Sequence, residues 1–364
     1  MEKDIAKKKR EIKSQNMGDL AKYRRHLFKN PILKCLFIEL TDRCNLNCRH
    51  CGSQCDPSKC HYIDTDLILK TIPEIAADLK EDPFMICVTG GEPLLHPDFE
   101  RIIRRINEHN IPWGMTSNAT LIDPVMAQKL KELSMGSISV SLDGLKEQHE
   151  WLRRVFGSFQ KAVDGIKNLQ NSGFDVQVTS VIHKGNFKDL EETYRFLSEL
   201  KVCSWRVINV DPIGRAETNS ELFLSKEEII KLNEFIREKR FDPTNTMDVC
   251  YGCSHYLSFE YEHETRDFYF QCGSGTNVAS ILYNGDIYGC LDIERRPELV
   301  QGNIAKDRFS DIWKNRFKEY RYDRSLQCTE CLICPEREFC GGDSMHTWDF
   351  DKKKPKLCLW RNIS

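Results

Sequence analysis

Residues 36–51 read LFIELTDRCNLNCRHC, a short apolar run followed by three cysteines. The apolar run at 36–40 predicts a buried strand. Cys44, Cys48 and Cys51 then follow with the spacing C-x3-C-x2-C. Three thiolates at this spacing can bind three irons of one cubane cluster and leave its fourth iron without a protein ligand. Zinc is the alternative, since Cys-x2-Cys also suits a zinc knuckle, but the longer first spacing and the strand before it favour iron.

Similar apolar runs recur along the first 210 residues and alternate with amphipathic helical patterns. The runs predict strands at 36–40, 85–89, 113–117, 137–141, 176–181 and 205–210. The patterns predict helices at roughly 64–80, 97–110, 123–134, 157–172 and 187–200, several with Asp, Pro or Ser at the start. Repeated strand–helix units imply an α/β protein with a parallel sheet, either curled into a barrel or doubly wound. In both arrangements the active site lies at the carboxyl ends of the strands.

The composition excludes several classes of protein. The 364 residues include 53 Lys plus Arg and 55 Asp plus Glu, so the net charge of −2 gives no reason to expect nucleic acid or a membrane surface as a partner. No apolar run has the length of a transmembrane helix or a secretory signal, and we expect a cytoplasmic protein. Because the cytosol keeps thiols reduced, the 17 cysteines indicate metal or redox chemistry rather than disulfides.

A Gly-Gly-Glu-Pro segment follows the second predicted strand. Gly90 and Gly91 permit a close approach of the backbone, and Glu92 supplies an acceptor for an ammonium group. Together with the cysteine loop, this segment resembles the active site of radical S-adenosylmethionine (SAM) enzymes. The resemblance implies that the three cysteines hold a [4Fe-4S] cluster and that SAM chelates the open iron, with Glu92 near its amino group. Reductive cleavage of SAM would then give a 5'-deoxyadenosyl radical.

The ends of the third and fourth predicted strands supply further polar groups. Ser117 and Asn118 end the third strand, Ser141 ends the fourth, and Arg153 follows on a helical segment. Hydroxyl and amide groups suit a ribose, and a guanidinium suits a carboxylate. These positions are similar to the SAM-binding strand ends of the family, with Ser141 and Arg153 as the main expected contacts. The alternative for each residue is a helix cap or a surface charge.

The C-terminal third carries a second cysteine pattern. Cys272 and Cys290 form C-x12-G-x4-C around Gly285, which is expected in a hairpin turn. The pattern resembles the SPASM extension, which adds auxiliary iron–sulfur clusters to radical enzymes that modify peptides and proteins. The resemblance implies a distal auxiliary cluster with four thiolate ligands, namely Cys331, Cys334, Cys340 and Cys358.

One position departs from the SPASM pattern. The family has a cysteine four residues after the one that matches Cys340, and this chain has Ser344 there. The missing cysteine normally binds the proximal auxiliary cluster. That cluster is therefore assured only of Cys272 and Cys290, and we expect one or two auxiliary clusters in all.

Cys253 is the favoured third ligand of the proximal cluster, with Cys250 and Cys328 as spare candidates. The fourth position could stay open to substrate or be closed by His346 or Asp343. It is also possible that the proximal cluster is absent and its cysteines are ordinary core thiols.

Two residues are candidates for catalysis. Cys203, near a strand terminus, could donate a hydrogen atom to a substrate radical, although a core thiol is the alternative. Asp292 lies two residues after Cys290, close to the position at which sulfatase-maturating relatives place a catalytic base. Cys55 and Cys60 are expected to be free thiols of a flexible loop.

These patterns predict a partial (βα)6, TIM-like radical SAM barrel with a C-terminal cysteine-rich SPASM domain. The predicted parts are a basic N-terminal arm at 1–30, the barrel at 31–215, a bridging segment at 216–270 and the SPASM domain at 271–364. The helix expected at 225–240 spans the junction, with a capping box at its start. The aromatic run that follows, at 256–270, is expected in the core rather than in a peptide groove.

The resemblance implies an enzyme that abstracts hydrogen from a residue of a ribosomally made peptide and produces a crosslink, an oxidation or an epimerisation. The expected partners are the peptide, with or without a leader, and an electron donor such as flavodoxin or ferredoxin. The basic arm is too short for a leader-recognition domain, so a separate protein could serve that purpose. The alternatives are a sulfatase-type maturase, a tetrapyrrole-modifying enzyme of the haem pathway, and a non-enzymatic iron–sulfur or zinc scaffold.

Overall fold

A computed structural model describes residues 2–363 and contains one dominant sheet of ten strands. The strands lie in the order β10-β9-β8-β1-β2-β3-β4-β5-β6-β7. They are β1 (Cys35–Glu39), β2 (Met85–Thr89), β3 (Trp113–Ser117), β4 (Ser137–Ser141), β5 (Val176–Ile182), β6 (Ser204–Asn209), β7 (Asp248–Tyr251), β8 (Val278–Ile281), β9 (Asp286–Tyr288) and β10 (Gly302–Asn303).

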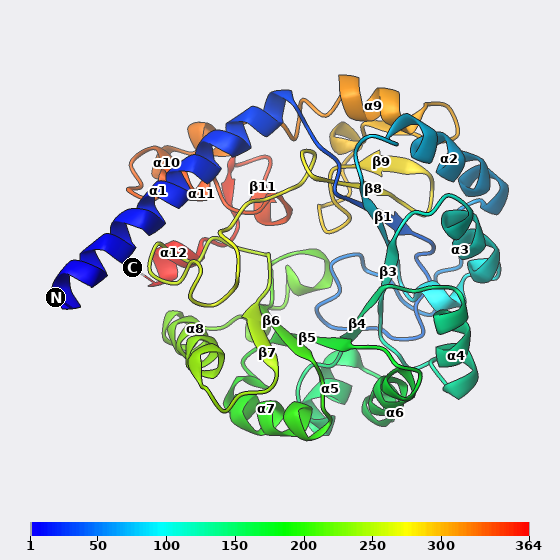
Figure 1. The fold of residues 1–364 in the computed structure, drawn as a ribbon, viewed down its shortest axis with the longest axis horizontal. Helices are drawn as coiled ribbons and strands as arrows, with labels where there is room; N and C mark the ends of the chain where they lie inside the picture. The colour runs from blue at the N-terminus through cyan, green and yellow to red at the C-terminus, as the bar shows by residue number, and fades with distance from the viewer. Residues whose placement is uncertain (1, 364) are drawn as a thin grey trace.

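The first six strands form the predicted partial barrel. β1 to β6 are parallel and pair in chain order. They curl around a central space with the helices outside (Figure 1). The predicted bounds of β2, β3 and β4 match the observed ones, β5 is one residue longer than predicted, and β1 and β6 are each shifted by one residue toward the N-terminus. The carboxyl ends of these strands therefore meet at one mouth of the barrel, as the sequence predicts.

The sheet continues beyond the six strands at both edges. β7, from the predicted bridging segment, pairs parallel with β6, and β8, from the predicted SPASM domain, pairs parallel with β1. β9 and β10 follow as antiparallel strands, and Gly285, with φ of +85°, occupies the predicted turn between β8 and β9. The sheet is thus continuous across the predicted boundaries at 215 and 270. The division of the chain into domains at these residues stays a prediction.

The helices between the strands bury one face each against the sheet. They are α2 (Thr65–Asp78), α3 (Phe99–Glu108), α4 (Pro124–Glu132), α5 (Lys146–Arg153), α6 (Ser158–Asn171), α7 (Leu190–Glu199) and α8 (Lys226–Phe241). On α3 the apolar residues recur at helical spacing, and Phe99, Ile102, Ile103 and Ile106 are all buried. At α8 the predicted capping box of Ser225 and Glu228 is present.

The chain begins and ends beside the same part of the molecule. α1 (Glu2–Lys29) is the predicted basic helix, and it runs beside α11 (Arg337–Cys340) at one side of the barrel (Figure 1). The other C-terminal elements are α9 (Phe309–Asn315), which contacts α2, and α10 (Thr329–Leu332), α12 (Leu359–Ile363), β11 (Trp348–Asp349) and β12 (Lys354–Pro355). Among residues 2–363, no helix combines the length and apolar character needed to cross a membrane.

Candidate active site

The cysteine loop after β1 packs against the Gly-Gly-Glu segment after β2. The backbone N–H of Gly91 donates to the carbonyl oxygen of Thr41 at 2.7 Å, and that of Glu92 donates to Arg43 at 2.9 Å. A Cβ on Gly91 would collide with the Arg43 carbonyl and lie 2.9 Å from the nitrogen of Cys44. The glycine is therefore required by the contact between the two loops.

The three cysteines of the loop pack together at the mouth of the barrel. Cys44, Cys48 and Cys51 belong to one buried cluster that also includes Cys55. Cys55 and Cys60 are free thiols, as predicted, but Cys55 is not on an open loop, because its side chain is only 3% exposed. It donates a hydrogen bond to the Cys51 sulfur, which lowers the pKa of Cys51 to about 6.

Nitrogen donors point at two of these sulfurs. Cys44 accepts from the backbone N–H of Leu46 at 3.4 Å and from the side-chain amide of Asn118 at 3.8 Å, and Cys48 accepts from Nη1 of Arg153 at 3.6 Å. Donors around the sulfurs are the surroundings that a negatively charged thiolate cluster requires. The residues present therefore fit a [4Fe-4S] cluster at this loop.

The exit loop after β6 also contacts the cysteine loop. Nε of Arg215 donates to the carbonyl oxygen of Cys48 at 2.7 Å, and Nη2 donates to that of Cys55 at 2.8 Å. A Cβ on Gly214, whose φ is +54°, would lie 2.5 Å from the carbonyl oxygen of Cys51. These two hydrogen bonds, here called the Arg215 clamp, were not predicted from the sequence, although a Gly-Arg pair after a predicted strand was a usable signal.

Glu92 is a buried carboxylate without a cationic partner. Its oxygens accept from Oγ of Ser117 and from the backbone N–H of Asn118, each at 2.9 Å. Among the described side chains of residues 4–361, no Lys or Arg forms an ion pair with it, and burial raises its pKa to about 7. A ligand with an ammonium group would supply the missing charge. Ser117 and Asn118, predicted to contact SAM themselves, instead orient Glu92.

Arg153 is engaged within the protein. Its Nε forms an ion pair with Oδ2 of Asp143 at 2.6 Å, and both side chains are buried. Burial alone would raise the pKa of Asp143, but the Arg153 guanidinium holds it well below its usual range. Nη1 of Arg153 donates to the Cys48 sulfur, which leaves Nη2 for a ligand. Ser141, the other expected SAM contact, ends β4 at the same mouth and is half-buried.

A cavity of about 580 Å³ connects the cysteine loop with the C-terminal part of the chain. His50 and Gly52 border it at the loop, and Ile208 and Val210 border it at the end of β6. At the other side it is lined by the three cysteines predicted for the proximal cluster, namely Cys253, Cys272 and Cys290. Phe268 and Tyr269 also line the cavity. The aromatic run at 256–270, which was expected in the core, is therefore only partly buried there.

The three proximal cysteines line this cavity together with Cys35, the first residue of β1, while Ser344 occupies the position of the missing family cysteine. Ser344 is 2% exposed, and its hydroxyl donates to the carbonyl oxygen of Ser254. The spare candidate Cys328 lies beside Cys331 instead, where it raises the pKa of Cys331 together with burial. Cys250 does not line the cavity. The residues present therefore fit a proximal cluster with three thiolates.

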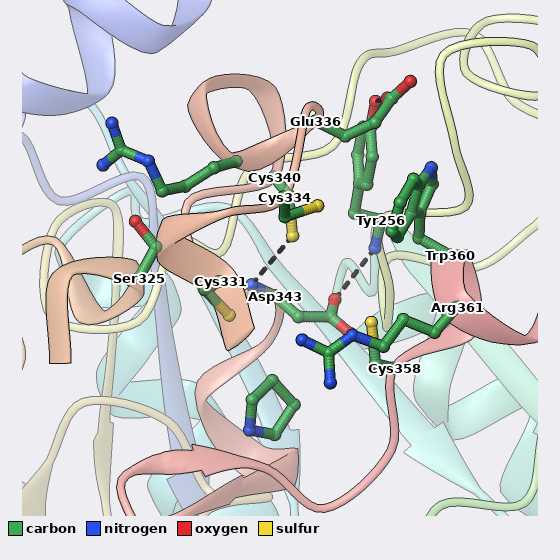
Figure 2. A pocket seen from close by; sticks show the side chains of 13 residues that line it. Tyr256, Ser325, Cys331, Cys334, Glu336, Cys340, Asp343, Cys358, Trp360 and Arg361 are labelled. Atoms are coloured by element: carbon green, nitrogen blue, oxygen red, sulfur yellow. Dashed lines mark hydrogen bonds between the residues drawn. The ribbon is translucent and has the colours of Figure 1, made fainter. Parts of the chain in front are cut away.

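The four predicted distal cysteines surround a second, small cavity. Cys331, Cys334, Cys340 and Cys358 all line it (Figure 2). The backbone N–H of Asp343 donates to the sulfur of Cys340 at 3.1 Å. Four thiols that converge on one space fit the ligand set of a cubane cluster.

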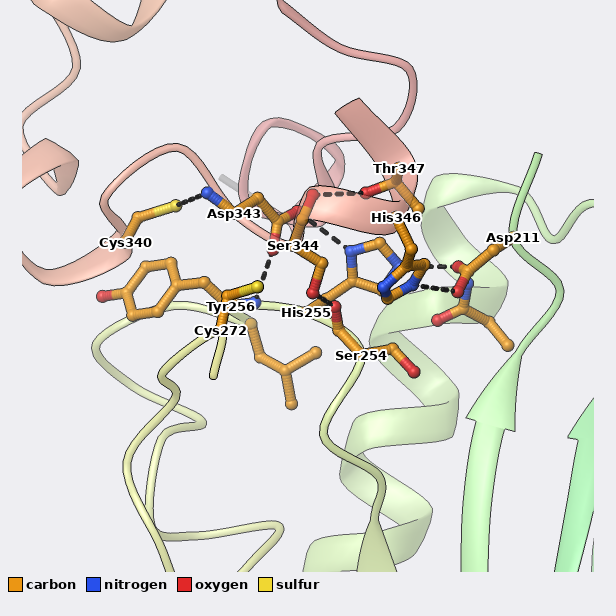
Figure 3. A network of polar contacts seen from close by, with 12 residues as sticks. Asp211, Ser254, His255, Tyr256, Cys272, Cys340, Asp343, Ser344, His346 and Thr347 are labelled. Carbon is orange, nitrogen blue, oxygen red and sulfur yellow. Dashed lines mark hydrogen bonds and ion pairs between the residues drawn. The ribbon is translucent and has the colours of Figure 1, made fainter. Parts of the chain in front are cut away.

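Four acidic and imidazole groups form a polar network beside the proximal cysteines (Figure 3). Asp211 accepts from His255 at 2.6 Å and from His346 at 2.8 Å, while Asp343 bonds the other ring nitrogen of His255 at 2.9 Å. His346 and Asp343 are thus engaged with the network. His346 lines the proximal cavity and Asp343 the distal one, and closure of the proximal cluster by either residue stays a prediction.

The same network has the composition of a metal site. The ligand atoms of Asp211, His255 and His346 lie within 4.8 Å of one another. Burial would lower the pKa of His255, but the two carboxylates raise it to about 10, so a metal ion would have to displace a firmly held proton. The geometry therefore favours an ion-paired hydrogen-bond network over a metal centre.

The two candidate catalytic residues have different outcomes. Asp292 lines the cavity with an exposed side chain, and the surrounding protein raises the pKa of its carboxyl while His346 opposes the shift. Cys203 precedes β6 and is exposed, and its sulfur donates to the carbonyl oxygen of Val176, the first residue of β5, at 3.1 Å. It therefore lies at the amino ends of the strands, opposite the site, and the prediction of a hydrogen-donating role for Cys203 is wrong.

Comparisons with known proteins agree with this architecture. Residues 38–197 match the family model of the radical SAM superfamily, and residues 272–335 match that of SPASM, an iron–sulfur cluster-binding domain. The chain is therefore a radical SAM enzyme with a SPASM domain. The two domains imply SAM with a [4Fe-4S] cluster at the first and auxiliary iron–sulfur clusters at the second.

Two kinds of characterised relative are similar to this chain. The AdoMet-dependent heme synthase of Methanosarcina barkeri is 27% identical over 89% of this chain and 95% of its own length. The mycofactocin maturase MftC of Mycolicibacterium smegmatis is 28% identical over 85% of this chain and 78% of its own length.

Solved structures share the fold. Streptococcus suis SuiB bound to S-adenosylmethionine superposes with a TM-score of 0.70 at 18% identity, over 86% of this chain and 73% of SuiB. anSMEcpe with bound AdoMet superposes with a TM-score of 0.73 at 19% identity, over 90% of this chain and 93% of that protein.

Proposed function

We propose that this radical SAM enzyme is a peptide maturase. A residue of a ribosomally made peptide would occupy the 580 Å³ cavity between the cysteine loop and the SPASM cysteines. SAM bound at the cluster of the loop would supply a 5'-deoxyadenosyl radical that abstracts hydrogen from that residue. The product would be a crosslink, an oxidation or an epimerised residue.

The charge of the cavity wall is the observation that carries this proposal. No Lys or Arg is among the described residues that line the cavity, whereas Asp211 and Asp292 are. A tetrapyrrole of the haem pathway carries several carboxylates, and the described lining offers them no Lys or Arg, while protonated His255 is already paired with Asp211 and Asp343. Burying such a substrate in this cavity would therefore be costly. Apolar side chains such as Val181 and Ile208, with amides such as Asn209, instead suit a neutral or cationic peptide segment.

The proposal assigns distinct tasks to the residues of the site. Glu92 would bind the ammonium group of SAM, and Nη2 of Arg153 and the hydroxyl of Ser141 would lie near the rest of that molecule. Loss of a hydrogen atom from a carbon leaves one further electron and one proton to remove when the outcome is an oxidation. Asp292 would accept that proton from the substrate. Cysteines of the SPASM domain would hold the iron–sulfur group that accepts the electron.

Other partners follow from the same chemistry. Reductive cleavage of SAM consumes an electron, which a small carrier such as flavodoxin or ferredoxin would supply. A substrate with a leader would be recognised by the main body or by a separate protein. Reduced thiols and an oxygen-sensitive open cluster are consistent with a cytoplasmic location.

A haem-pathway activity is the second candidate. Its support is the similarity to the M. barkeri heme synthase over 95% of that protein's length. It would require the carboxylates of the substrate to remain outside the described cavity or to bind His346.

Two measurements on one preparation separate the candidates. The protein is co-expressed with small peptides encoded beside its gene, and each peptide is examined by mass spectrometry. The purified protein is then titrated with Fe-coproporphyrin III, and the Soret band is recorded. A mass change in a peptide without a Soret shift supports the maturase, whereas a saturable Soret shift without any modified peptide supports the haem-pathway enzyme.

A further inference from the structure

The N-terminal helix places a buried arginine on the end of α11. Arg24 is only 8% exposed, and its Nη2 donates to the carbonyl oxygen of Glu338 at 2.6 Å. Its Nη1 donates to the carbonyl oxygens of Phe339 at 3.0 Å and Cys340 at 3.3 Å. The guanidinium therefore caps the last turn of the helix that ends at Cys340, one of the four cysteines around the distal cavity.

The contact between Arg24 and this turn is tight. A Cβ on Gly341, whose φ is +67°, would lie 2.5 Å from Cζ of Arg24, so the guanidinium lies directly on the backbone beside Cys340. Met17, which precedes Arg24 on α1, is buried in the same region against Tyr256 and Phe270. The helix thus holds Arg24 in place through apolar packing as well as hydrogen bonds.

Among the side chains that the structure describes, residues 4–361, no carboxylate forms an ion pair with Arg24. Burial lowers the pKa of Arg24, and the nearby Cys340 and Asp323 oppose this shift. A buried cation without a counter-ion is costly. A cluster held by four thiolates carries net negative charge and would supply the missing counter-charge.

The surroundings of the two auxiliary sites differ in charge. Arg337 and Arg361 line the distal cavity together with two carboxylates, those of Glu336 and Asp343, and Arg361 lies beside Cys358 in Figure 2. The cavity at the proximal cysteines has carboxylates and no described Lys or Arg. Arg24, which donates to the backbone at Cys340, adds a third cation at the distal site.

We infer that Arg24 is a positioning residue of the distal auxiliary cluster that raises its reduction potential. Reduction by one electron adds a negative charge to the cluster, and a fixed cation in the protein interior stabilises that charge. The three hydrogen bonds also fix the turn that carries Cys340. This role is independent of the substrate and does not rest on the proposed peptide maturase.

The test is a redox titration of the reconstituted full-length protein, followed by electron paramagnetic resonance. The distal signal is assigned as the one that Cys358→Ser removes. Arg24→Gln is expected to lower the midpoint potential of this signal and to leave that of the cluster at the Cys44 loop unchanged. Arg24→Lys keeps the charge, so its potential is expected to stay near that of the wild type.

Arg25→Gln is the matched control. Arg25 is the next residue of the same helix, but its side chain is 48% exposed and pairs with Glu338 at 3.6 Å. Solvent screens its charge, so its removal is expected to leave the distal potential unchanged.

Two results would overturn the inference. One is a wild-type midpoint potential in Arg24→Gln with the distal cluster intact. The other is loss of the distal cluster in both Arg24→Gln and Arg24→Lys, which would assign Arg24 to folding alone. If only Arg24→Gln loses the cluster, retention of a wild-type potential in Arg24→Lys supports the role of the charge, and a lowered potential there contradicts it.

Discussion

The guanidinium of Arg215 donates to the carbonyl oxygen of Cys48 at 2.7 Å, although 167 residues separate them. Arg215 follows β6 and Cys48 follows β1, so the contact joins the first and sixth strands of the barrel across its mouth. The cysteine loop is consequently fixed from two directions, by this clamp and by the Gly-Gly-Glu segment after β2.

Replacement of Arg215 by Gln should release one side of the loop. Two buried carbonyl oxygens would lose charged donors, each worth about 1.5–3 kcal/mol. We expect at least a tenfold decrease in 5'-deoxyadenosine formation and a lower iron content after reconstitution. Arg43→Gln is the control, because Arg43 lies on the same loop with an exposed side chain. Equal activity of Arg215→Gln and Arg43→Gln would show that the clamp is dispensable.

Glu92 should make the ligand-free protein less stable as the pH rises. Its pKa is about 7 in the folded state against an ordinary value of 4.5, so between these values the folded protein holds a proton that the unfolded chain has released. The free energy of unfolding should therefore fall across this window, by roughly 3 kcal/mol at 1.36 kcal/mol per pK unit.

Glu92→Gln should remove this pH dependence, because an amide does not titrate. The same variant should weaken SAM binding by about tenfold or more, since it removes the charge that faces the ammonium group. Chemical denaturation between pH 4.5 and 8 and calorimetric titration with SAM measure the two effects. An unchanged pH profile in the variant would assign the loss of stability to other groups.

Replacement of Asp292 by Asn should separate SAM cleavage from substrate conversion. Asp292 lines the cavity together with Cys272 and Cys290 of the SPASM domain. We expect normal 5'-deoxyadenosine formation in the absence of substrate and a loss of about 10²–10⁴-fold in product formation, typical of a missing general base. Glu294→Gln is the control, since Glu294 is exposed and does not line the cavity. Full product formation by Asp292→Asn would exclude Asp292 as the base.

Cys203→Ser should leave both SAM cleavage and product formation within twofold of the wild type. The side chain lies at the amino ends of the strands, where it bonds the backbone of Val176. Chromatography with mass spectrometry would quantify 5'-deoxyadenosine and the product together. A large loss of product in Cys203→Ser with normal stability would require a different arrangement of the barrel.

The parts of this structure that local sequence determines were predictable. Strands such as β2 and β4 follow from short apolar runs, and the C-x3-C-x2-C loop follows from the spacing of its cysteines. The position of Cys203 was also within reach, because a residue before a parallel strand lies at the end opposite the site.

Long-range pairings were not predictable in the same way. β8 pairs with β1 although 243 residues separate Cys35 from its partner Val278, and no local pattern specifies that contact. The network of Asp211, His255 and His346 joins three distant segments, and each residue alone gave no signal of it. The sequence likewise does not distinguish Arg24 from the other basic residues of the N-terminal helix, because its contact with Cys340 depends on the tertiary fold.

The central claim is radical SAM chemistry at the loop that contains Cys48. The most direct measurement is 5'-deoxyadenosine formation by anaerobically reconstituted protein with SAM and dithionite, beside Cys48→Ala. We predict product from the wild type and none from Cys48→Ala, with the auxiliary iron of that variant retained. Equal product from both proteins, or none from a wild type with its full iron content, would contradict the account.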